Sequence, residues 1–443
     1  MRRFLTPFSV LSFGPSLLAW WLVLGGPAPA RAQPPGALDT ANRLVDQDGD
    51  EGLRKRFRDQ NRQFSGFVKG EQVPGAQDAG ILETGAKWFV YRLTWSELRR
   101  TGGIEDVFRE FDQQVLQPAL KAKEQNQDFM KMYTQQLQTQ LQRILQNASV
   151  VNQINGARLM ARWGRSGQTE YADFLVGVLQ DKANNDAVKF YTLQGLMELR
   201  GANPRLQPQA REAKVDQALL DYLAAKSQAG DNLPGPEADG VRYVRREAVR
   251  ALAQPQQPGQ NPDLPGVPLA LARVVGRDAG MVPSPSLSEQ AEAAIGLGQM
   301  QNKRFANYQP DYAAYFVGLF LVDFVTRAGG DQRSATPSQA WKYQALRLSN
   351  AMDTWQGDPG VSPYVKGVAA RGSTVLKNIT AGQTVDPTSL QALRDQVGAN
   401  PPQPTLIQGD AGSVVKPGAP AETPAGVPAG VPAEAPTGLP TGG

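Results

Sequence analysis

Residues 147–201 read NASVVNQINGARLMARWG, then RSGQTE, then YADFLVGVLQDKANNDAVKFYTLQGLMELRG, and they carry the clearest indication of the fold. Its last part carries a mainly apolar stripe: Val188, Thr192, Leu193, Leu196 and Leu199. Spacings of three and four residues place such side chains on one face of a helix. Residues 171–179 show the same spacing, and residues 181–185 between the two parts are a short polar turn. The stretch therefore predicts three helices joined by two turns.

The ends of the last helix also carry signals. Asp186 stands where an N-cap or first-turn acid is favoured, and Gly201 stands just past the apolar stripe, where it suits a helix stop. Two antiparallel helices joined by a short loop bury only one side of the pair. Such a hairpin needs neighbours on its other side, so the stretch predicts a stack of hairpins.

A small residue followed four positions later by a large aliphatic one recurs along the chain: Gly156 and Met160, Thr192 and Leu196, Ala248 and Leu252, Ala293 and Leu297. The steps between the small residues are 36, 56 and 45 residues. They bracket the period of about 40–47 residues found in HEAT and armadillo repeats. Residues 241–253 (VRYVRREAVRALA) and 155–164 (NGARLMARWG) resemble the second helix of a HEAT repeat.

The resemblance to HEAT or armadillo proteins covers roughly residues 129–355. It implies an all-α fold, namely an α-solenoid: a right-handed array of about five HEAT-like helical hairpins, which we place at residues 129–398. An irregular helical bundle is the alternative, because the small-x-x-x-large pattern also occurs in other helical proteins.

Charge and residue types exclude several kinds of site. The 443-residue chain has 46 basic and 42 acidic side chains; without Arg2, Arg3 and Arg31 the balance is 43 against 42, or +1. A nearly neutral chain gives no electrostatic case for binding nucleic acid. Cys and His are both absent. Disulfides, thiolate or imidazole metal sites and catalytic triads built on His therefore cannot form.

Residues 1–32 have the pattern of a secretory signal peptide. Two arginines precede an apolar run at 17–24, and ARA at 30–32 is a cleavage pattern that leaves Gln33 as the mature N-terminus. An uncleaved membrane anchor is the alternative, although the run is short for a span of ~20 residues. We expect an exported protein of the periplasm or cell envelope, with no membrane span after cleavage.

Residues 33–80 are predicted to be a flexible polar leader. Three acids at alternate positions, starting at Asp46, imitate an EF-hand loop, but Glu51 stands where that loop needs Gly and Phe57 where it needs Glu. We expect a solvated acidic turn there rather than a calcium site. A short amphipathic helix is expected to follow, with these apolar residues: Leu53, Phe57 and Phe64.

Residues 81–128 are expected to form an N-terminal helical cap. Residues 88–95, WFVYRLTW, are interpreted as helix, with a strand as the alternative because of their aromatic and β-branched content. Trp88 and Trp95 either fill the core of the cap or form a platform that stacks on sugars. In the Gln-rich helical region that follows, Pro118 should start or kink a helix.

The remaining helices are predicted from apolar periodicity and from the loops between them. Helices are expected at 215–225, 269–275, 311–325, 338–355 and 388–397, and loops at 202–209, 228–239 and 255–268. The helix at 311–325 is the most apolar, and its Asp323 and modest length argue against a membrane span. It should be buried on most sides, with 338–355 as its partner helix.

Residues 399–443 form a tail rich in Pro, Ala and Gly. Its prolines recur at every fourth position: Pro420, Pro424, Pro428, Pro432, Pro436 and Pro440. Such spacing blocks both helix and sheet, so we expect a disordered segment. The tail is either passive, a spacer or a ligand for a partner.

No motif for catalysis or cofactor binding stands out. Residues 296–301 have only two of the three glycines of a dinucleotide fingerprint and lie in an expected helix. Ser413 and Lys416 match Ser-x-x-Lys but lie in the tail. Asn147 and Asn378 match glycosylation acceptors. We assign no catalytic, cofactor-binding or metal-binding residues, and the partner-binding residues stay unassigned.

The sequence favours an exported, non-enzymatic interaction scaffold that binds a protein partner, because helical-repeat arrays bind partners along extended surfaces. Two alternatives remain. One is a structural cell-envelope component that self-associates, and the other is a carboxylate-based hydrolase on a helical scaffold. A large multimer would favour the first, and a pair of acids clustered in a deep pocket would favour the second.

Overall fold

The structure, a computed structural model, describes residues 42–203, 206–230, 233–254, 266–300, 310–330 and 338–399. By its internal contacts the chain divides into residues 1–43 and 44–443, and every described helix belongs to the second part. The expected signal peptide at 1–32 lies outside the described residues, and so does the expected tail beyond residue 399.

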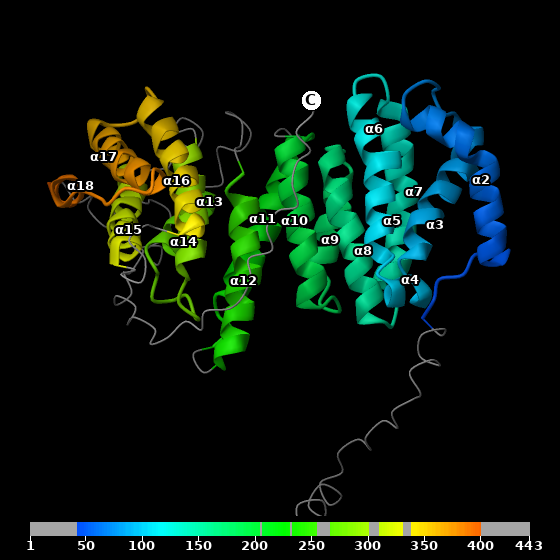
Figure 1. Ribbon diagram of the computed structural model, residues 1–443, viewed down its shortest axis with the longest axis horizontal. Coiled ribbons are helices and arrows are strands. Elements are labelled where there is room, and N and C mark those ends of the chain that lie inside the picture. Colours follow the sequence, from blue (N-terminus) through cyan, green and yellow to red (C-terminus); the bar gives the residue numbers. More distant parts are fainter. Residues whose placement is uncertain are drawn as a thin grey trace, which may run out of the picture. The chain divides into compact units, whose positions relative to one another are not determined.

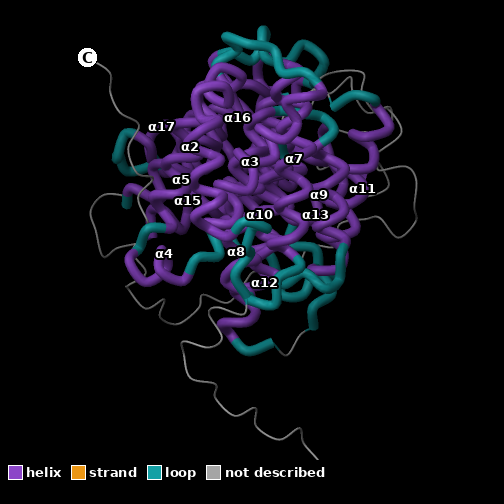
Figure 2. Tube along the Cα trace, turned by 90° about the vertical axis from the view of Figure 1, so that its right-hand side faces the viewer, coloured by secondary structure: helices purple, strands orange, loops and turns teal. Residues whose placement is uncertain are grey.

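Every regular element of the described part is a helix, which confirms the all-α prediction; Figure 2 shows these helices joined by loops. The α-helices are α2 (Gly49–Val68), α3 (Ala79–Arg92), α4 (Ser96–Thr101), α5 (Ile104–Phe111), α6 (Gln117–Lys121), α7 (Gln127–Leu145), α8 (Val150–Trp163), α9 (Tyr171–Gln180), α10 (Asp186–Ala202), α11 (Gln209–Lys226), α12 (Gly235–Leu252), α13 (Gly266–Val275), α14 (Leu287–Gln299), α15 (Pro310–Gly330), α16 (Gln339–Gly357), α17 (Pro363–Thr380) and α18 (Pro387–Ala399). A short π-helix, Asp112–Leu116, joins α5 to α6.

The stretch at 147–201 folds as predicted into helix, turn, helix, turn, helix, which are α8, α9 and α10. Asn185 caps α10, because its side-chain oxygen accepts a hydrogen bond of 3.0 Å from the Val188 amide. Asp186 follows in the first turn, where its charge suits the positive end of the helix dipole.

The predicted helix stop at Gly201 is wrong, since α10 continues to Ala202. Asn203 leaves the helix with φ −139° and ψ 86°. Proline follows Asn203 in the sequence, and a residue before proline is restricted to extended conformations. The helix therefore ends because of the proline rather than the glycine.

From α7 onward the helices contact one another in an alternating order (Figure 1). Even-numbered helices form one series, in which α8 packs on α10, α10 on α12, α12 on α14 and α14 on α16. Odd-numbered helices form a second series that runs from α7 through α9, α11 and α13 to α15. The two series are joined where successive helices pack together, as α9 does with α10, α11 with α12 and α13 with α14.

Small residues mark places where even-numbered helices approach closely. A Cβ atom added to Gly296 of α14 would lie 2.5 Å from the Cβ of Ala253, which follows α12. One added to Gly298 would lie 3.0 Å from the Ala351 carbonyl oxygen of α16. Larger side chains there would push the helices apart. The small residues of the recurring sequence pattern in these helices are fully buried: Thr192, Ala248 and Ala293.

Much of the expected polar leader at 33–80 is helical. Gly49–Val68 form α2, whose buried face contains Leu53, Phe57, Phe64, Phe67 and Val68. Most of the charged residues of this segment lie on the exposed side of the same helix. The helical part of the chain therefore begins ahead of residue 81, where the cap was expected to start.

The N-terminal cap contains helix rather than strand at the aromatic stretch, as predicted, because residues 88–92 lie in α3. Phe57 of α2 stacks on Trp88 of α3, with ring centroids 5.0 Å apart. Pro118 lies in the first turn of α6. Because α6 continues directly from α5 through the π-helix, Pro118 lies at an irregular turn within a helical run rather than at the start of a separate helix.

The C-terminal helices differ from expectation in their neighbours. The expectation that α16 is the partner of α15 is wrong, since α16 packs mainly on α14 and α17. It meets α15 through Trp341, whose ring centroid lies 4.9 Å from that of Phe324. The expected helices do not include α17, which packs on both α15 and α16, although its residues Val365, Val368 and Leu376 follow helical spacing. The loop expected at 228–239 is shorter, because α12 begins at Gly235.

α15 is buried on most sides, as predicted. Its buried side chains are Tyr312, Ala313, Ala314, Phe316, Val317, Phe320, Leu321, Phe324, Val325 and Ala328. Asp323 near its C-terminal end pairs with Arg277 and Arg327, each at 2.9 Å. Among the described residues, no helix combines the length and the apolar character that a membrane crossing requires.

Candidate functional site

The acidic run that imitates an EF-hand is engaged by basic side chains. Asp46 is buried, and its carboxylate pairs with Arg56 and, at 3.2 Å, with Lys87 of α3. Burial raises the pKa of Asp46, but the hydrogen bonds from Arg56 and Lys87 outweigh it, so the pKa lies below its ordinary value. The expectation of a solvated turn is wrong for Asp46. The described residues contain no cluster of three or more potential metal ligands.

The two tryptophans of the aromatic stretch are used in packing. Trp88 stacks on Phe57, and the guanidinium of Arg92 lies 4.6 Å from its ring centroid. Trp95 is only 7% exposed and meets Trp88 edge to face, with centroids 6.3 Å apart. A platform for sugars needs an open ring face, so this arrangement favours the core role over the glycan role.

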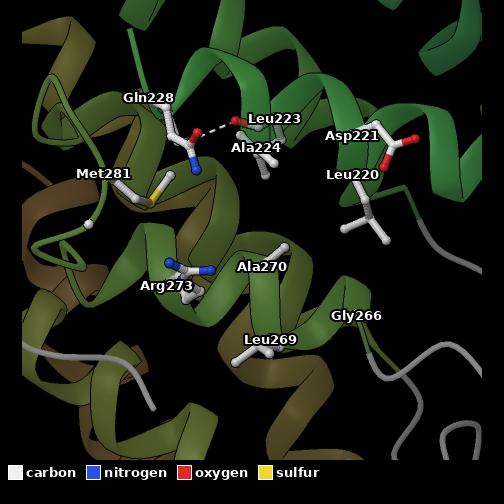
Figure 3. A pocket seen from close by; sticks show the side chains of 12 residues that line it. Leu220, Asp221, Leu223, Ala224, Gln228, Gly266, Leu269, Ala270, Arg273 and Met281 are labelled. Atoms are coloured by element: carbon white, nitrogen blue, oxygen red, sulfur yellow. Dashed lines mark hydrogen bonds between the residues drawn. The ribbon is translucent and has the colours of Figure 1, made fainter. Parts of the chain in front are cut away.

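A cavity of about 310 Å³ lies between α11 and α13 (Figure 3). Its walls are mainly aliphatic: Leu220, Leu223, Ala224, Leu269, Ala270 and Met281. Asp221 is the one carboxylate among the described residues that line this cavity. The lining residue Arg273 donates a hydrogen bond of 2.8 Å to Asp278. A neighbouring cavity of about 580 Å³ likewise has Asp278 as its one described carboxylate. Neither cavity supplies the two acids of a glycoside hydrolase.

Two carboxylates line a third cavity, of about 290 Å³, between α7 and α9. Asp173 lies in the first turn of α9, and Asp181 directly follows the C-terminal end of the same helix. Asp173 binds Arg211 at 2.9 Å and Lys214 at 3.0 Å. Burial raises the pKa of Asp173, but these hydrogen bonds outweigh it and the pKa is lowered. Such an acid stays ionised at neutral pH and is unsuited to donate a proton.

Acidic side chains buried between helices are bound by arginines. Glu289, at the start of α14, accepts a hydrogen bond of 2.5 Å from Arg245 of α12, and both side chains are fully buried. Arg200 of α10 pairs with Asp216 of α11 at 3.0 Å. Removing one member of a buried pair leaves an uncompensated charge and costs about 3–5 kcal/mol. These acids therefore join helices and are not free for catalysis.

The same kind of pairing reaches the surface on α12, α14 and α16. Arg250 of α12 donates to the buried Glu247 at 3.0 Å and lies 3.9 Å from Glu292 of α14. Arg347 of α16 donates two hydrogen bonds to Glu292, of 2.5 and 2.7 Å. Arg246 pairs with Glu247 at 3.3 Å. The arginine side chains are 27–31% exposed, so they reach solvent while the glutamates beneath hold them.

Tyrosines flank these arginines on the outward side of the same helices. Tyr243 of α12 is 51% exposed, and its ring stacks on Phe190 of α10 with centroids 4.9 Å apart. The Arg246 guanidinium lies 4.8 Å from the Tyr243 centroid. Tyr343 of α16 is 63% exposed, and the Arg347 guanidinium lies 5.8 Å from its centroid. Ring and cation contacts thus connect the tyrosines to the arginine network.

We call this area the Tyr–Arg surface. Its exposed or half-exposed members are Tyr243, Arg246, Arg250, Tyr343, Leu346 and Arg347. Three arginines above two glutamates leave it with a net charge of +1. Tyr and Arg are enriched among residues that dominate binding energy, and a clamped arginine has less conformational freedom to lose on binding. The surface is suited to an extended partner segment with carboxylates.

The exposed tyrosines and arginines of this surface follow helical spacing in the sequence, but the apolar periodicity used to predict the helices does not include them. Tyr243, Arg246 and Arg250 recur at spacings of three and four, on the side of the helix opposite the apolar stripe. Tyr343 and Arg347 are likewise four residues apart. The two stripes are connected through buried glutamates. This connection depends on which helices are neighbours, and the sequence does not show which helices these are. No residue of the surface was therefore assigned from sequence.

Comparison with known proteins identifies no relative of this chain. No protein-family model matches it, and neither a curated protein nor a solved structure is significantly similar to it. Its function is therefore inferred from the helix contacts and from the Tyr–Arg surface.

Proposed function

We propose that this protein is an exported, non-enzymatic scaffold whose helices from α7 onward form an α-solenoid of HEAT-like hairpins. The alternating contacts support this fold, because helices two apart in the chain pack together in both series, as in stacked hairpins. The close approaches at Gly296 and Gly298 support regular stacking of the even-numbered helices. Stacked hairpins expose a row of helices as one extended face.

The function that we propose is binding of a protein partner across the Tyr–Arg surface. The observation that carries it is the unbroken series of contacts from Tyr243 to Tyr343, in which Glu247 and Glu292 hold the intervening arginines. Partner carboxylates would accept hydrogen bonds from the arginines, and apolar partner groups would pack on the tyrosine rings. Such a site spans three helices, so it would recognise a segment rather than a small molecule.

The cavities support a binding role over the hydrolase alternative. Each of the two cavities beside α13 has a single described carboxylate. Of the two acids that line the α7–α9 cavity, Asp173 is neutralised by Arg211 and Lys214. Self-association that paired two Tyr–Arg surfaces would bring together two surfaces of net charge +1, which electrostatic repulsion disfavours.

The test is photo-crosslinking of the full-length chain in the cells from which it comes. A photoreactive residue replaces Asn350, which is exposed on α16 one turn beyond Leu346. We expect a crosslink to a different protein, reduced at least about ten-fold by the double change Tyr243→Ala and Tyr343→Ala. Leu319→Ala on α15 is the control, because Leu319 is an exposed large side chain (42%) that lies outside the Tyr–Arg surface.

Two results would contradict the proposal. A crosslink that is unchanged by the tyrosine substitutions would place the partner elsewhere. Crosslinks confined to a second copy of this chain, together with a large multimer in solution, would favour the structural cell-envelope component. Export is tested separately: mass spectrometry of the exported protein should find Gln33 at the N-terminus, and an intact N-terminus in the membrane fraction would refute cleavage.

A further inference from the structure

We infer that residues 400–443 of this chain bind its own Tyr–Arg surface when no partner covers it. The inference rests on the proposed function, because it names an internal ligand for the same surface. The described chain ends at Ala399, the last residue of α18. The composition of residues 400–443 and the position of α18 carry the inference.

The segment has the chemistry of a ligand for exposed tyrosines. Its prolines recur at every fourth position from Pro420 to Pro440. Proline-rich segments bind aromatic surfaces in the polyproline II conformation, at low entropic cost because proline already restricts φ. Tyr343, 63% exposed, offers its ring for such contacts, whereas the Tyr243 ring, 51% exposed, already stacks on Phe190 and lies beside Arg246, so it contributes only through its exposed edge.

The charge of the segment is opposite to that of the surface. Residues 400–443 contain three acids, Asp410, Glu422 and Glu434, against one basic residue, Lys416, which gives −2. The surface has a net charge of +1 from three arginines and two glutamates. Glu422 and Glu434 lie within the proline run. One stretch of chain can therefore place carboxylates on arginines and prolines on tyrosines together.

The proline run can reach the surface. α18 packs on α17, and α17 packs on α16, which carries Tyr343 and Arg347. Packed helices lie about 8–10 Å apart, so these two steps, with two more from α16 through α14 to α12 and its Tyr243, amount to about 40 Å. The residues between Ala399 and Pro420 span up to about 60 Å at ~3.1 Å per residue. The tether is thus longer than the gap that it must bridge.

Because the segment is attached to the chain, even a weak contact is enough to keep the Tyr–Arg surface occupied. A ligand on a flexible tether has an effective concentration in the millimolar range. Residues 400–443 would therefore cover the surface even if the same segment bound only weakly as a free peptide. A partner would have to displace this internal ligand, so the surface would select partners that bind it more tightly.

The test exploits the absence of cysteine from the chain. In the full-length protein, Ala429→Cys in the proline run is combined with Asn350→Cys on α16 or, as a control, with Leu319→Cys on α15. α15 contacts α18 directly, whereas α16 is reached through α17. An unbound segment would therefore meet position 319 at least as often as position 350. We expect disulfide formation about ten-fold faster at position 350.

Equal rates at positions 350 and 319 would overturn the inference. If the rate at 350 is faster, Tyr243→Ala with Tyr343→Ala should reduce it to the control rate, and so should the triple change Pro424→Ala, Pro428→Ala and Pro432→Ala. A rate insensitive to both sets of changes would also overturn it. Disulfides formed equally fast between singly substituted chains would show binding between copies and contradict an internal ligand.

The outcomes separate this inference from the proposed function. Partner crosslinking that depends on Tyr343, combined with equal disulfide rates, would reject the internal ligand and leave the scaffold function standing. Fast, tyrosine-dependent disulfide formation without any crosslinked partner would support the internal ligand and count against the scaffold function.

Discussion

The N-terminal helices and the later even-numbered helices share an apolar core, but they differ in the side-chain contacts that add to it. Around α2, α3, α5, α7 and α8, seven aromatic rings form a closed circuit with centroids 5.2–6.2 Å apart: Phe57, Phe89, Phe111, Trp163, Tyr133, Phe129 and Phe64. From α10 to α16, two fully or almost fully buried arginine–carboxylate pairs join helices, Arg200 with Asp216 and Arg245 with Glu289, and a partly exposed one joins α16 to α14, Arg347 with Glu292.

Aromatic contacts and arginine–carboxylate pairs suit the two regions to different roles. Aromatic contacts are stabilising and nearly independent of pH and salt, and each adds about 0.5–1.5 kcal/mol beyond burial. Buried ion pairs contribute less to stability, but they require a particular geometry of the helices that they join. In the later region the same chemistry continues outward to the Tyr–Arg surface. The aromatic region therefore contributes mainly packing, and the ion-paired region carries the Tyr–Arg surface.

The largest effect is expected at the buried pair of α12 and α14. Glu289→Ala leaves the fully buried Arg245 without its partner and should lower the free energy of unfolding by about 3–5 kcal/mol. Replacing both residues with Met should recover most of the loss, because an apolar pair of similar volume avoids burying charge. Urea unfolding measures both changes. A double variant as unstable as the single one would show that the pair is itself strongly stabilising.

The next effect distinguishes close helix packing from helix propensity. Gly296→Ala brings a methyl group to 2.5 Å from the Cβ of Ala253 and should destabilise by about 1–3 kcal/mol. Gly177→Ala, within α9 and with open space around its added Cβ, should instead stabilise by up to about 1 kcal/mol. Thermal unfolding of the two variants gives the comparison. Stabilisation by both changes would mean that α14 and the end of α12 separate easily.

Local signals were sufficient to predict where many helices lie. The stripe at Val188, Leu193 and Leu196 gives α10, and the small residues Ala248 and Ala293 are buried at helix contacts. The end of α10 was predicted at the wrong residue, because Pro204 rather than Gly201 determines where the helix stops. Apolar periodicity indicates which face of a helix is buried. It uses only the residues of that helix, so it does not identify the neighbouring helix.

Neighbours and ion pairs could not be predicted in this way. The apolar face of α16 is readable, but nothing in the segment says that α17 and α14 rather than α15 cover most of it. Glu247 and Glu292 look like ordinary surface acids in the sequence, yet they lie buried beneath Arg250 and Arg347. The Tyr–Arg surface depends on such long-range contacts, so its residues could not be assigned without the structure.

Two aspartates should give the regions opposite responses to pH. Burial raises the pKa of Asp112, beside α8, and Arg162 and Arg165 only partly offset this. Its protonated form is favoured by folding, so its contribution is present below the unfolded pKa of about 3.9 and is lost as pH rises through the folded pKa. Asp173 has a lowered pKa, despite burial, because Lys214 and Arg211 bind it. Its contribution is present above the unfolded pKa and is lost as pH falls through the folded pKa.

Urea unfolding of Asp112→Asn and Asp173→Asn between pH 3 and 7, compared with the unsubstituted chain, measures these contributions. Relative to that chain, Asp173→Asn should lose stability as pH rises from 3, and Asp112→Asn should gain it. Both effects should stay below about 1 kcal/mol, since the side chains are partly exposed. Slopes of the same sign would show that Asp112 is stabilised by its arginines as Asp173 is.

The smallest effect on stability is expected at the Tyr–Arg surface itself. Tyr343 is 63% exposed, so Tyr343→Ala should change the free energy of unfolding by no more than about 0.5 kcal/mol. Phe111→Ala, at a fully buried ring of the aromatic region, should cost about 3–5 kcal/mol in the same assay. A side chain that contributes little to folding but whose loss abolishes crosslinking is one that serves binding. If Tyr343→Ala costs more than about 2 kcal/mol, its ring is structural and the contrast between the two regions disappears.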